Sequence, residues 1–210
     1  MNNNYIIAFS NQKGGVGKTT LCVLFANYLV AKGKKVIVVD CDGQTSIKSK
    51  RENDKNKYVE DKPQYDVHTL DISNPDKVKR ELTALRKQDA IVLLDTPGHI
   101  SQKGLPPLFA LTDYIVVPFK FEPTSIQSTG VFITFIKRLK KSLDFMKSDM
   151  IFVVNDWDTR FGKQDEMELY EKTEISLARL GMVSEGPQLR IFRWPEILRL
   201  CCVHMMSIYY

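Results

Sequence analysis

Short apolar runs alternate along the chain with longer segments in which apolar residues recur at helical spacing. The runs predict strands at 5–10, 35–40, 65–70, 90–95, 114–118 and 150–154, and the segments between them predict helices at 19–32, 76–88, 103–111, 124–144 and 163–180. The run Val36–Val39 has no polar alternation, which is typical of a strand buried on both faces of a parallel sheet. The repeated alternation predicts an α/β fold, a mostly parallel, doubly wound sheet with helices on both faces, formed by residues 1–210 as a single domain.

A glycine-rich segment with two lysines, Asn-Gln-Lys-Gly-Gly-Val-Gly-Lys-Thr-Thr, joins the first predicted strand to the first helix at residues 11–20. The ordinary phosphate-binding loop, G-x-x-x-x-G-K-[ST], has glycine where this chain has Gln12, but the Gly17-Lys18-Thr19 end is intact. At a strand-to-helix turn, backbone N–H groups and the helix N-terminus attract an anion. We expect Lys18 to pair with nucleotide phosphates and Thr19 to bind Mg²⁺. The alternative is a glycine-rich turn with incidental lysines, which the order of strand, loop and helix disfavours.

Carboxylates follow two of the predicted strands. Asp40 and Asp42 come at the end of one apolar run, and Asp95 comes at the end of another. Open parallel sheets bind ligands beyond the carboxyl ends of their strands, which would bring these side chains to the glycine-rich loop. Mg²⁺ prefers hard oxygen ligands and usually keeps several waters. One aspartate alone could simply cap the next helix, but two such strands beside a phosphate-binding loop favour a magnesium nucleotide.

The segments 13–20, 40–44 and 95–98, in this order, resemble the ParA/MinD family of deviant-Walker P-loop ATPases. The resemblance is greatest to the short ParA proteins that segregate plasmids and chromosomes. It implies ATP and Mg²⁺ binding, an ATP-dependent sandwich homodimer, and slow hydrolysis of ATP to ADP and phosphate. A partner protein would stimulate this hydrolysis, either a centromere-binding, ParB-like protein or another cargo adaptor. One departure is Gly43, where the family usually has proline.

The resemblance also implies roles for single residues. Lys13 matches the signature lysine that reaches the phosphates bound by the other subunit, and Asp42 matches an acid that orients the attacking water. With Lys18, these two residues form the expected catalytic set. Asp40 and Asp95 match acids that surround the metal, largely through water. The residues expected to hold the metal are Thr19, Asp40 and Asp95. The residues expected to bind the nucleotide are Gly14, Gly15, Val16, Gly17, Lys18, Thr19, Thr20 and Asn155.

Base and DNA contacts rest on weaker patterns. Asn155 ends the last predicted strand, where the family often has an asparagine against the adenine base; a capping role is the alternative. The stretch Arg190–Glu196 is similar to an R-x-x-R-x-x-E segment of ParA proteins, in which arginines contribute to non-specific DNA binding. Four further cations lie on the polar side of helix 124–144: Lys137, Arg138, Lys140 and Lys141. They form either a solvated helix face or a patch that, with Arg190 and Arg193 across a dimer, follows a DNA backbone.

Composition narrows the class of protein. With 210 residues, of which 43% are hydrophobic and 26% charged, the chain is typical of a globular domain, and its net charge of +5 is only mildly basic. The four cysteines are Cys22, Cys41, Cys201 and Cys202. They form no disulfide framework or zinc pattern, which favours reduced thiols. The sequence shows no signal peptide and no apolar run near the ~18 residues of a membrane span, so we expect a cytoplasmic protein without membrane binding.

Three functions remain open on the sequence. The first is a partitioning ATPase that moves DNA with a partner protein. The second keeps the ATPase dimer but positions another cargo, such as a conjugation or secretion apparatus. The third is a P-loop ligase or reductase, but a reductase would need cysteines that bridge an iron–sulfur cluster across a dimer. Cys22 and Cys41 lie beside the nucleotide motifs instead.

Overall fold

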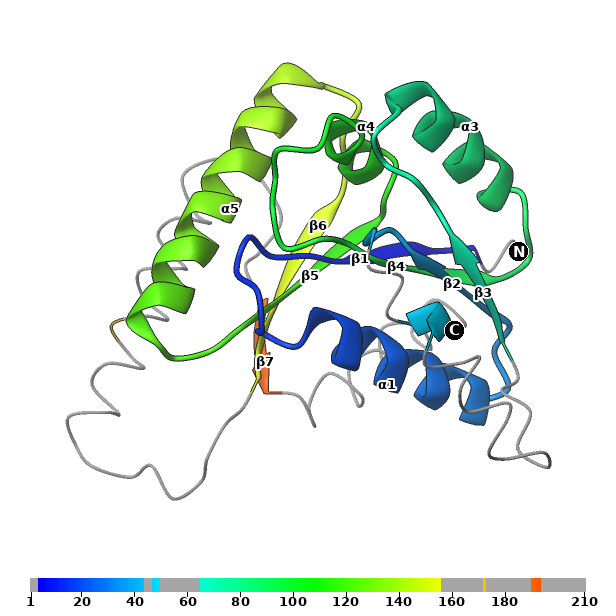
Figure 1. Ribbon diagram of the computed structural model, residues 1–210, viewed down its shortest axis with the longest axis horizontal. Coiled ribbons are helices and arrows are strands. Elements are labelled where there is room, and N and C mark those ends of the chain that lie inside the picture. Colours follow the sequence, from blue (N-terminus) through cyan, green and yellow to red (C-terminus); the bar gives the residue numbers. More distant parts are fainter. Residues whose placement is uncertain (1–3, 44–46, 50–64, 156–171, 173–189, 194–210) are drawn as a thin grey trace, which may run out of the picture.

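A seven-stranded parallel sheet forms the centre of the protein (Figure 1). The computed structural model describes residues 4–43, 47–49, 65–155, 172 and 190–193. Its strands are β1 (Ile6–Phe9), β2 (Val36–Asp40), β3 (Asp66–Thr69), β4 (Ile91–Asp95), β5 (Tyr114–Phe119), β6 (Asp149–Val154) and β7 (Arg190–Arg193). Its helices are α1 (Lys18–Ala31), α3 (Pro75–Leu85), α4 (Leu105–Ala110) and α5 (Pro123–Ser142). The strand order β3-β2-β4-β1-β5-β6-β7 places β1 in the middle, with β2, β3 and β4 on one side of it and β5, β6 and β7 on the other.

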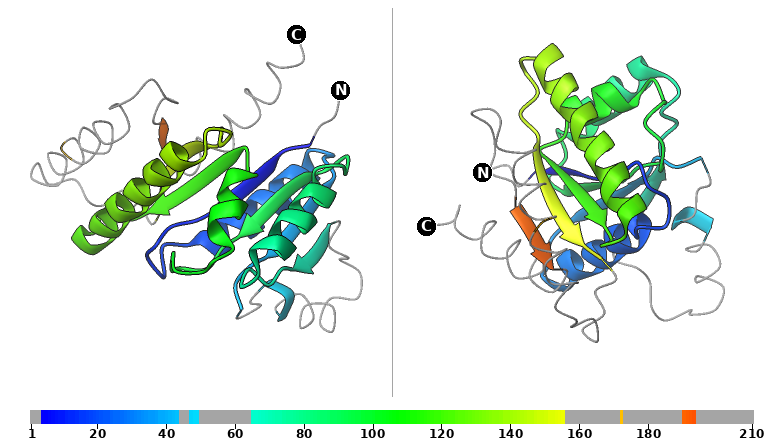
Figure 2. Two further views of the ribbon diagram at one scale, coloured as in Figure 1. Left: turned by 90° about the horizontal axis from the view of Figure 1, so that it is seen from above. Right: turned by 90° about the vertical axis from the view of Figure 1, so that its left-hand side faces the viewer.

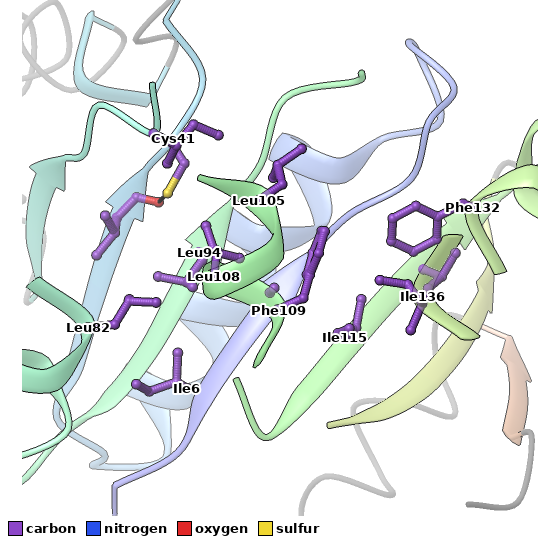
Figure 3. Close-up of a cluster of buried hydrophobic side chains, with 14 of the residues drawn as sticks. Ile6, Cys41, Leu82, Leu94, Leu105, Leu108, Phe109, Ile115, Phe132 and Ile136 are labelled. Carbon is purple, nitrogen blue, oxygen red and sulfur yellow. Dashed lines mark hydrogen bonds between the residues drawn. The ribbon is translucent and has the colours of Figure 1, made fainter. Parts of the chain in front are cut away.

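Helices cover both faces of this sheet. α1 lies on one face, and α3, α4 and α5 lie on the other, as the perpendicular views show (Figure 2). Under α1, the buried Leu21, Phe25 and Leu29 belong to one apolar cluster with strand residues such as Val38 and Leu93. The opposite cluster, part of which is drawn in Figure 3, includes Ile6, Leu82, Leu94, Leu105, Leu108, Phe109, Ile115, Phe132 and Ile136. The predicted doubly wound α/β fold is therefore confirmed.

Local sequence explains where α3 begins. The side chain of Asn74 accepts hydrogen bonds from the backbone N–H groups of Asp76 and Lys77, at 3.0 and 3.1 Å. Pro75 occupies the first helical position, where a missing N–H costs nothing. Val78 and Leu82 then form the buried side of the helix. The cap and the apolar spacing together fix both the start of this helix and the face that packs on the sheet.

β7 corrects the prediction that 150–154 is the last strand. It pairs in parallel with β6 and extends the sheet by one strand. Its two central residues, Ile191 and Phe192, are flanked by arginines, so the apolar run is shorter than those that predict the other strands. The sequence pattern missed the strand because its pairing depends on β6, which lies far away in the sequence.

The predicted helix at 163–180 lies outside the described residues except for residue 172, and the segment from residue 201 lies outside them as well. The single domain over residues 1–210 stays a prediction. Within the described part of the chain, no helix combines the length and the apolar character needed to cross a bilayer.

Candidate nucleotide-binding site

The loop between β1 and α1, residues 10–17, has open space around two of its three glycines. No described atom lies within 4 Å of the position that a Cβ of Gly14 or Gly15 would take. Gly15 and Gly17 have φ values of 74° and 92°, in the left-handed region that glycine adopts without a steric cost. No described side chain caps the start of α1. The N–H groups of its first turn are therefore available to an anion, as the sequence predicts for a phosphate-binding loop.

Lys18 begins α1 and is buried beneath this loop, with only 8% of its surface exposed. Its Nζ donates a hydrogen bond to the carbonyl of Lys13 at 3.3 Å. The loop after β4 passes close by, because a Cβ on Gly98 would lie 3.3 Å from the same Nζ. Burial lowers the pKa of the Lys18 ammonium, and the carboxylates of Asp95 and Asp42 partly oppose that effect. A bound phosphate would likewise stabilise the charged form.

Asp40 and Asp95 stand directly opposite each other on the neighbouring strands β2 and β4. Both are almost fully buried, at 2% and 1% exposure. Asp40 accepts hydrogen bonds from the N–H groups of Asp42 at 3.2 Å and Ile47 at 3.1 Å, but burial still raises its pKa. Burial also raises the pKa of Asp95 to about 7, although a hydrogen bond with the Thr19 side chain opposes that rise. Two such carboxylates side by side favour a cation or a proton between them.

These residues fit a magnesium nucleotide. Among the described atoms, Oδ1 of Asp95 is buried and has no hydrogen-bond partner. The same aspartate forms a hydrogen bond with the side chain of Thr19, at the start of α1. The described residues contain no group of three or more His, Cys, Asp or Glu side chains that could hold a metal by themselves. A cation held here would therefore share the Thr19 hydroxyl and the two carboxylates with phosphate and water, which is the coordination that Mg²⁺ accepts.

The two other residues of the expected catalytic set lie at the edge of this site. Lys13 is partly exposed, and its backbone carbonyl accepts a hydrogen bond from the Lys18 ammonium. Asp42 is also partly exposed, and its N–H donates to the carboxylate of Asp40. The fold thus brings Lys13, Lys18 and Asp42 to the same end of the sheet. Their catalytic roles stay predictions.

Asn155, directly after β6, contacts the phosphate-binding loop itself. Its Nδ2 donates to the carbonyl of Val16 at 2.9 Å, and its N–H donates to the carbonyl of Phe119 at 2.8 Å. A Cβ on Gly17 would come within 2.2 Å of the same Nδ2. The side chain therefore supports the loop from the side of β6. A contact with the adenine base stays a prediction.

Two buried polar residues of the site were missed by the sequence reasoning. Asn11, 1% exposed, lies two residues before Lys13, the first predicted site residue, and its Nδ2 donates to the carbonyl of Pro118 at 2.8 Å and to Oγ1 of Thr129 at 2.9 Å. Thr96, also 1% exposed, donates from its hydroxyl to the carbonyl of Phe9 at 3.0 Å. Both are polar residues adjacent to a motif residue at the end of a buried strand. That position is the signal that could have identified them.

The cationic helix face predicted on α5 is only partly solvated. Arg138 and Lys141 are exposed, whereas Lys137 is half-buried. Partial burial lowers the pKa of Lys140, and the charge of Asp149 opposes this. The backbone of β7 carries the two predicted arginines at its ends. DNA binding by any of these residues stays a prediction.

The cysteines within the described residues do not suit an iron–sulfur reductase. Cys22 is 0% exposed and Cys41 is 2% exposed. Burial raises the pKa of both thiols, which disfavours the thiolate that a cluster needs. Neither side chain can reach the surface to bridge a cluster between two subunits. Cys201 and Cys202 lie outside the described residues.

Comparison with known proteins places the chain among nucleotide-binding proteins of partition systems. A model of the CobQ/CobB/MinD/ParA nucleotide binding domain matches residues 7–191. The sporulation initiation inhibitor protein Soj of Bacillus subtilis is 28% identical in an alignment that covers 87% of this chain and 87% of that protein. The chromosome-partitioning ATPase Soj of Thermus thermophilus is 31% identical in an alignment that covers 66% of this chain and 64% of that protein.

Solved structures share the fold. A plasmid partition protein from Borrelia burgdorferi has a TM-score of 0.69 at 17% identity and covers 95% of this chain and 99% of its own. The structure of pNOB8 ParA bound to nonspecific DNA has a TM-score of 0.63 at 21% identity and covers 87% of this chain and 77% of its own. The family match covers the sheet, the phosphate-binding loop and both acidic strand ends. The chain belongs to the CobQ/CobB/MinD/ParA family of nucleotide-binding domains and is a homologue of the Soj and ParA partition ATPases.

Proposed function

We propose that this protein is an ATP-dependent switch for DNA partition. It binds ATP with Mg²⁺, forms a homodimer, and by itself slowly hydrolyses ATP to ADP and phosphate, and a partner protein accelerates this hydrolysis. One observation carries the proposal: the buried Lys18, the start of α1 that no described side chain caps, and the paired Asp40 and Asp95 meet at one end of the sheet. The chromosome-partitioning and plasmid partition proteins among the relatives support DNA as the cargo.

Different residues of the chain would have different roles at this site. The Lys18 ammonium and the first N–H groups of α1 would bind the phosphates, and burial strengthens that attraction because water screens it less. Mg²⁺ held through Thr19, Asp40 and Asp95 would supply positive charge that offsets the charge of the phosphates. Asp42, partly exposed beside Asp40, would orient the attacking water.

Dimerisation would depend on Lys13. Two nucleotides between facing subunits bring many negative charges together, and a cation from each subunit offsets their repulsion. Lys13 is suited to this role because it is partly exposed at the entrance of the loop, whereas Lys18 is buried. A ParB-like protein would act on this dimer in the cytoplasm. Non-specific DNA would bind the cations of α5 and β7.

Nucleotide binding is tested by calorimetry with Lys18→Ala. Removing the buried ammonium should weaken ATP binding at least tenfold, which corresponds to about 1.4 kcal/mol. Lys35→Ala is the matched control, because Lys35 is exposed beside Asp89, at 3.9 Å, and lies before β2 at the opposite end of the strands. Equal ATP affinity in wild type and Lys18→Ala would contradict the site.

The DNA cargo is tested separately, by measuring the binding of a random-sequence duplex with fluorescence anisotropy. Wild-type protein with a non-hydrolysable ATP analogue should bind the duplex, and the affinity should fall as salt rises, because phosphate contacts release counterions. With ADP the binding should be lost. If the protein binds ATP but binds no DNA in either nucleotide state, an ATPase that positions a cargo other than DNA would be favoured over DNA partition.

A further inference from the structure

Asn11 links the phosphate-binding loop to a helix that the proposed chemistry does not use. It follows Ser10 at the end of β1, and its side chain is 1% exposed. Its Nδ2 donates to the Pro118 carbonyl of β5 at 2.8 Å and to Oγ1 of Thr129 of α5 at 2.9 Å. A side-chain amide has two N–H protons, so these two bonds use its donors completely. Figure 1 shows the loop after β1 running beside α5.

The contact continues into α5 through buried hydroxyls. Oγ1 of Thr129 donates to the carbonyl of Ser125 at 2.8 Å. Oγ of Ser125 accepts a hydrogen bond from the N–H of Lys120 at 3.0 Å. Ser125 and Thr129 are both 0% exposed. Oδ1 of Asn11 is buried and has no partner among the described atoms, but its two N–H groups and both hydroxyls are paired. Inside a protein, losing one of these partners leaves another buried polar group unpaired at a high cost.

Thr129 differs from three exposed hydroxyls of α5. Ser128, Thr134 and Ser142 each donate to the carbonyl four residues earlier, at 2.8, 2.9 and 3.0 Å, in exposed positions. Thr129 makes the same local bond but also accepts the bond from Asn11 across β5. The hydrogen bond to the carbonyl four residues earlier is therefore not the only interaction of the Thr129 hydroxyl, which also holds the side chain of Asn11.

We propose that Asn11 and Thr129 are a positioning pair for the phosphate-binding loop, a role that rests on the proposed ATPase function. Lys13 follows Asn11 by two residues, and its carbonyl holds the Lys18 ammonium at 3.3 Å. Fixing Asn11 against α5 therefore fixes the start of the segment that carries both lysines. Asn155 supports the other end of the loop through Val16, at 2.9 Å. The pair touches no reacting atom and acts through the position of Lys13.

The first test is hydrogen exchange on the nucleotide-free protein. Thr129→Val removes the hydroxyl at nearly constant shape, and Thr134→Val is the matched control, because it removes an exposed bond of the same kind. The reporter is the amide of Ser10, which donates to the Val116 carbonyl at 2.9 Å. Its exchange should accelerate about tenfold in Thr129→Val, with exchange of β4 unchanged. Equal exchange in both variants, or a uniform rise over the whole sheet, would overturn the proposal.

The second test is steady-state hydrolysis. In Thr129→Val, kcat should fall about tenfold, because a misplaced Lys13 acts on turnover, while KM for ATP changes less than about threefold, because Lys18 and Thr19 remain. Thr129→Ser keeps the hydroxyl and should restore kcat. Asn11→Ala should match Thr129→Val, and the double variant should be no worse than either. Additive losses, or an unchanged kcat, would refute the pair.

Failure of the proposed function looks different from failure of the pair. If wild-type protein hydrolyses no ATP, the proposed function is wrong, and the exchange of the Ser10 amide still decides whether the pair holds the loop. If wild type hydrolyses ATP and Thr129→Val equals Thr134→Val in both measurements, the function stands and the positioning pair is wrong.

Discussion

Three neighbouring glycines offer a graded test of the loop geometry. Gly14 lies outside the left-handed region, and no described atom comes within 4 Å of its Cβ position. Gly15 has equal space but a φ of 74°. Gly17 combines a φ of 92° with a Cβ position 2.2 Å from Nδ2 of Asn155. Alanine should therefore cause no strain at position 14, backbone strain alone at position 15, and backbone strain together with a steric clash at position 17.

The structure gives a different free energy of unfolding for each variant. Replacing glycine with alanine stabilises by about 0.4–1 kcal/mol through the unfolded chain, so Gly14→Ala should lose no stability. An alanine in the left-handed backbone conformation costs about 1–2 kcal/mol, so Gly15→Ala should lower the free energy of unfolding by about 1 kcal/mol. Gly17→Ala must also displace Asn155 from the Val16 carbonyl, and an unpaired buried polar group costs about 1–3 kcal/mol. Its total loss should be about 3 kcal/mol.

Urea unfolding of the nucleotide-free proteins, followed by far-UV circular dichroism, measures these differences without interference from phosphate binding. Asn155→Ala alone should lose about 1 kcal/mol. The double variant Gly17→Ala/Asn155→Ala should lose only about 2 kcal/mol, less than the two single losses together, because the clash has been removed. Equal losses for Gly15→Ala and Gly17→Ala, or a strictly additive double variant, would refute the conclusion that the contact between Asn155 and the loop contributes to stability.

Three further predictions concern the chemistry of the site. Lys13→Ala should bind nucleotide but stay monomeric with a non-hydrolysable ATP analogue in light scattering, whereas wild type dimerises; a variant that still dimerises would contradict the role of Lys13. Asp42→Ala should bind ATP normally but hydrolyse it at least about tenfold more slowly in a phosphate-release assay, because the water loses its orienting group; wild-type turnover would move that role to Asp40 or Asp95. Burial raises the pKa of Asp95 from its unfolded value near 3.8 to about 7 in the folded, nucleotide-free protein. The folded state therefore binds this proton more tightly than the unfolded state. The resulting stabilisation is fully present below pH 3.8 and is lost as the pH rises through 7. Asp95→Asn should therefore flatten the unfolding free energy between pH 4 and about 7.5 in thermal scans, and a slope equal to that of wild type would exclude Asp95 as its cause.

The sequence was sufficient for the elements whose information is local. Val36–Val39 marks a buried strand because its side chains are all β-branched, and Gly17-Lys18-Thr19 marks a phosphate loop because of the short spacing of its residues. Both lie where the pattern predicts them. β7 was missed because Ile191 and Phe192 form too short a run, and only the parallel neighbour β6 makes a strand of them.

Contacts between distant residues lay beyond the sequence. Asn11 and Thr129 are 118 positions apart, and neither residue type predicts the other as a partner. Asn155 was placed correctly at the end of a strand, but its contact with Val16 depends on how close β6 brings it to the loop. Packing also decides that the pKa of Asp95 is raised, because this carboxylate is buried on the strand next to β1.

The central place of β1 has a consequence for the order in which the protein forms. β1 is made first, but its two neighbours in the sheet are β4 and β5: Ile6 pairs with Val92, and Ile7 pairs with Tyr114. At a synthesis rate of about 5–20 residues per second, β1 leaves the ribosome several seconds before either partner. The loop that follows it is tied to β5 through Ser10 and Val116. A nascent chain therefore has no nucleotide site until β5 has been made, and ATP can stabilise only the later stages of folding.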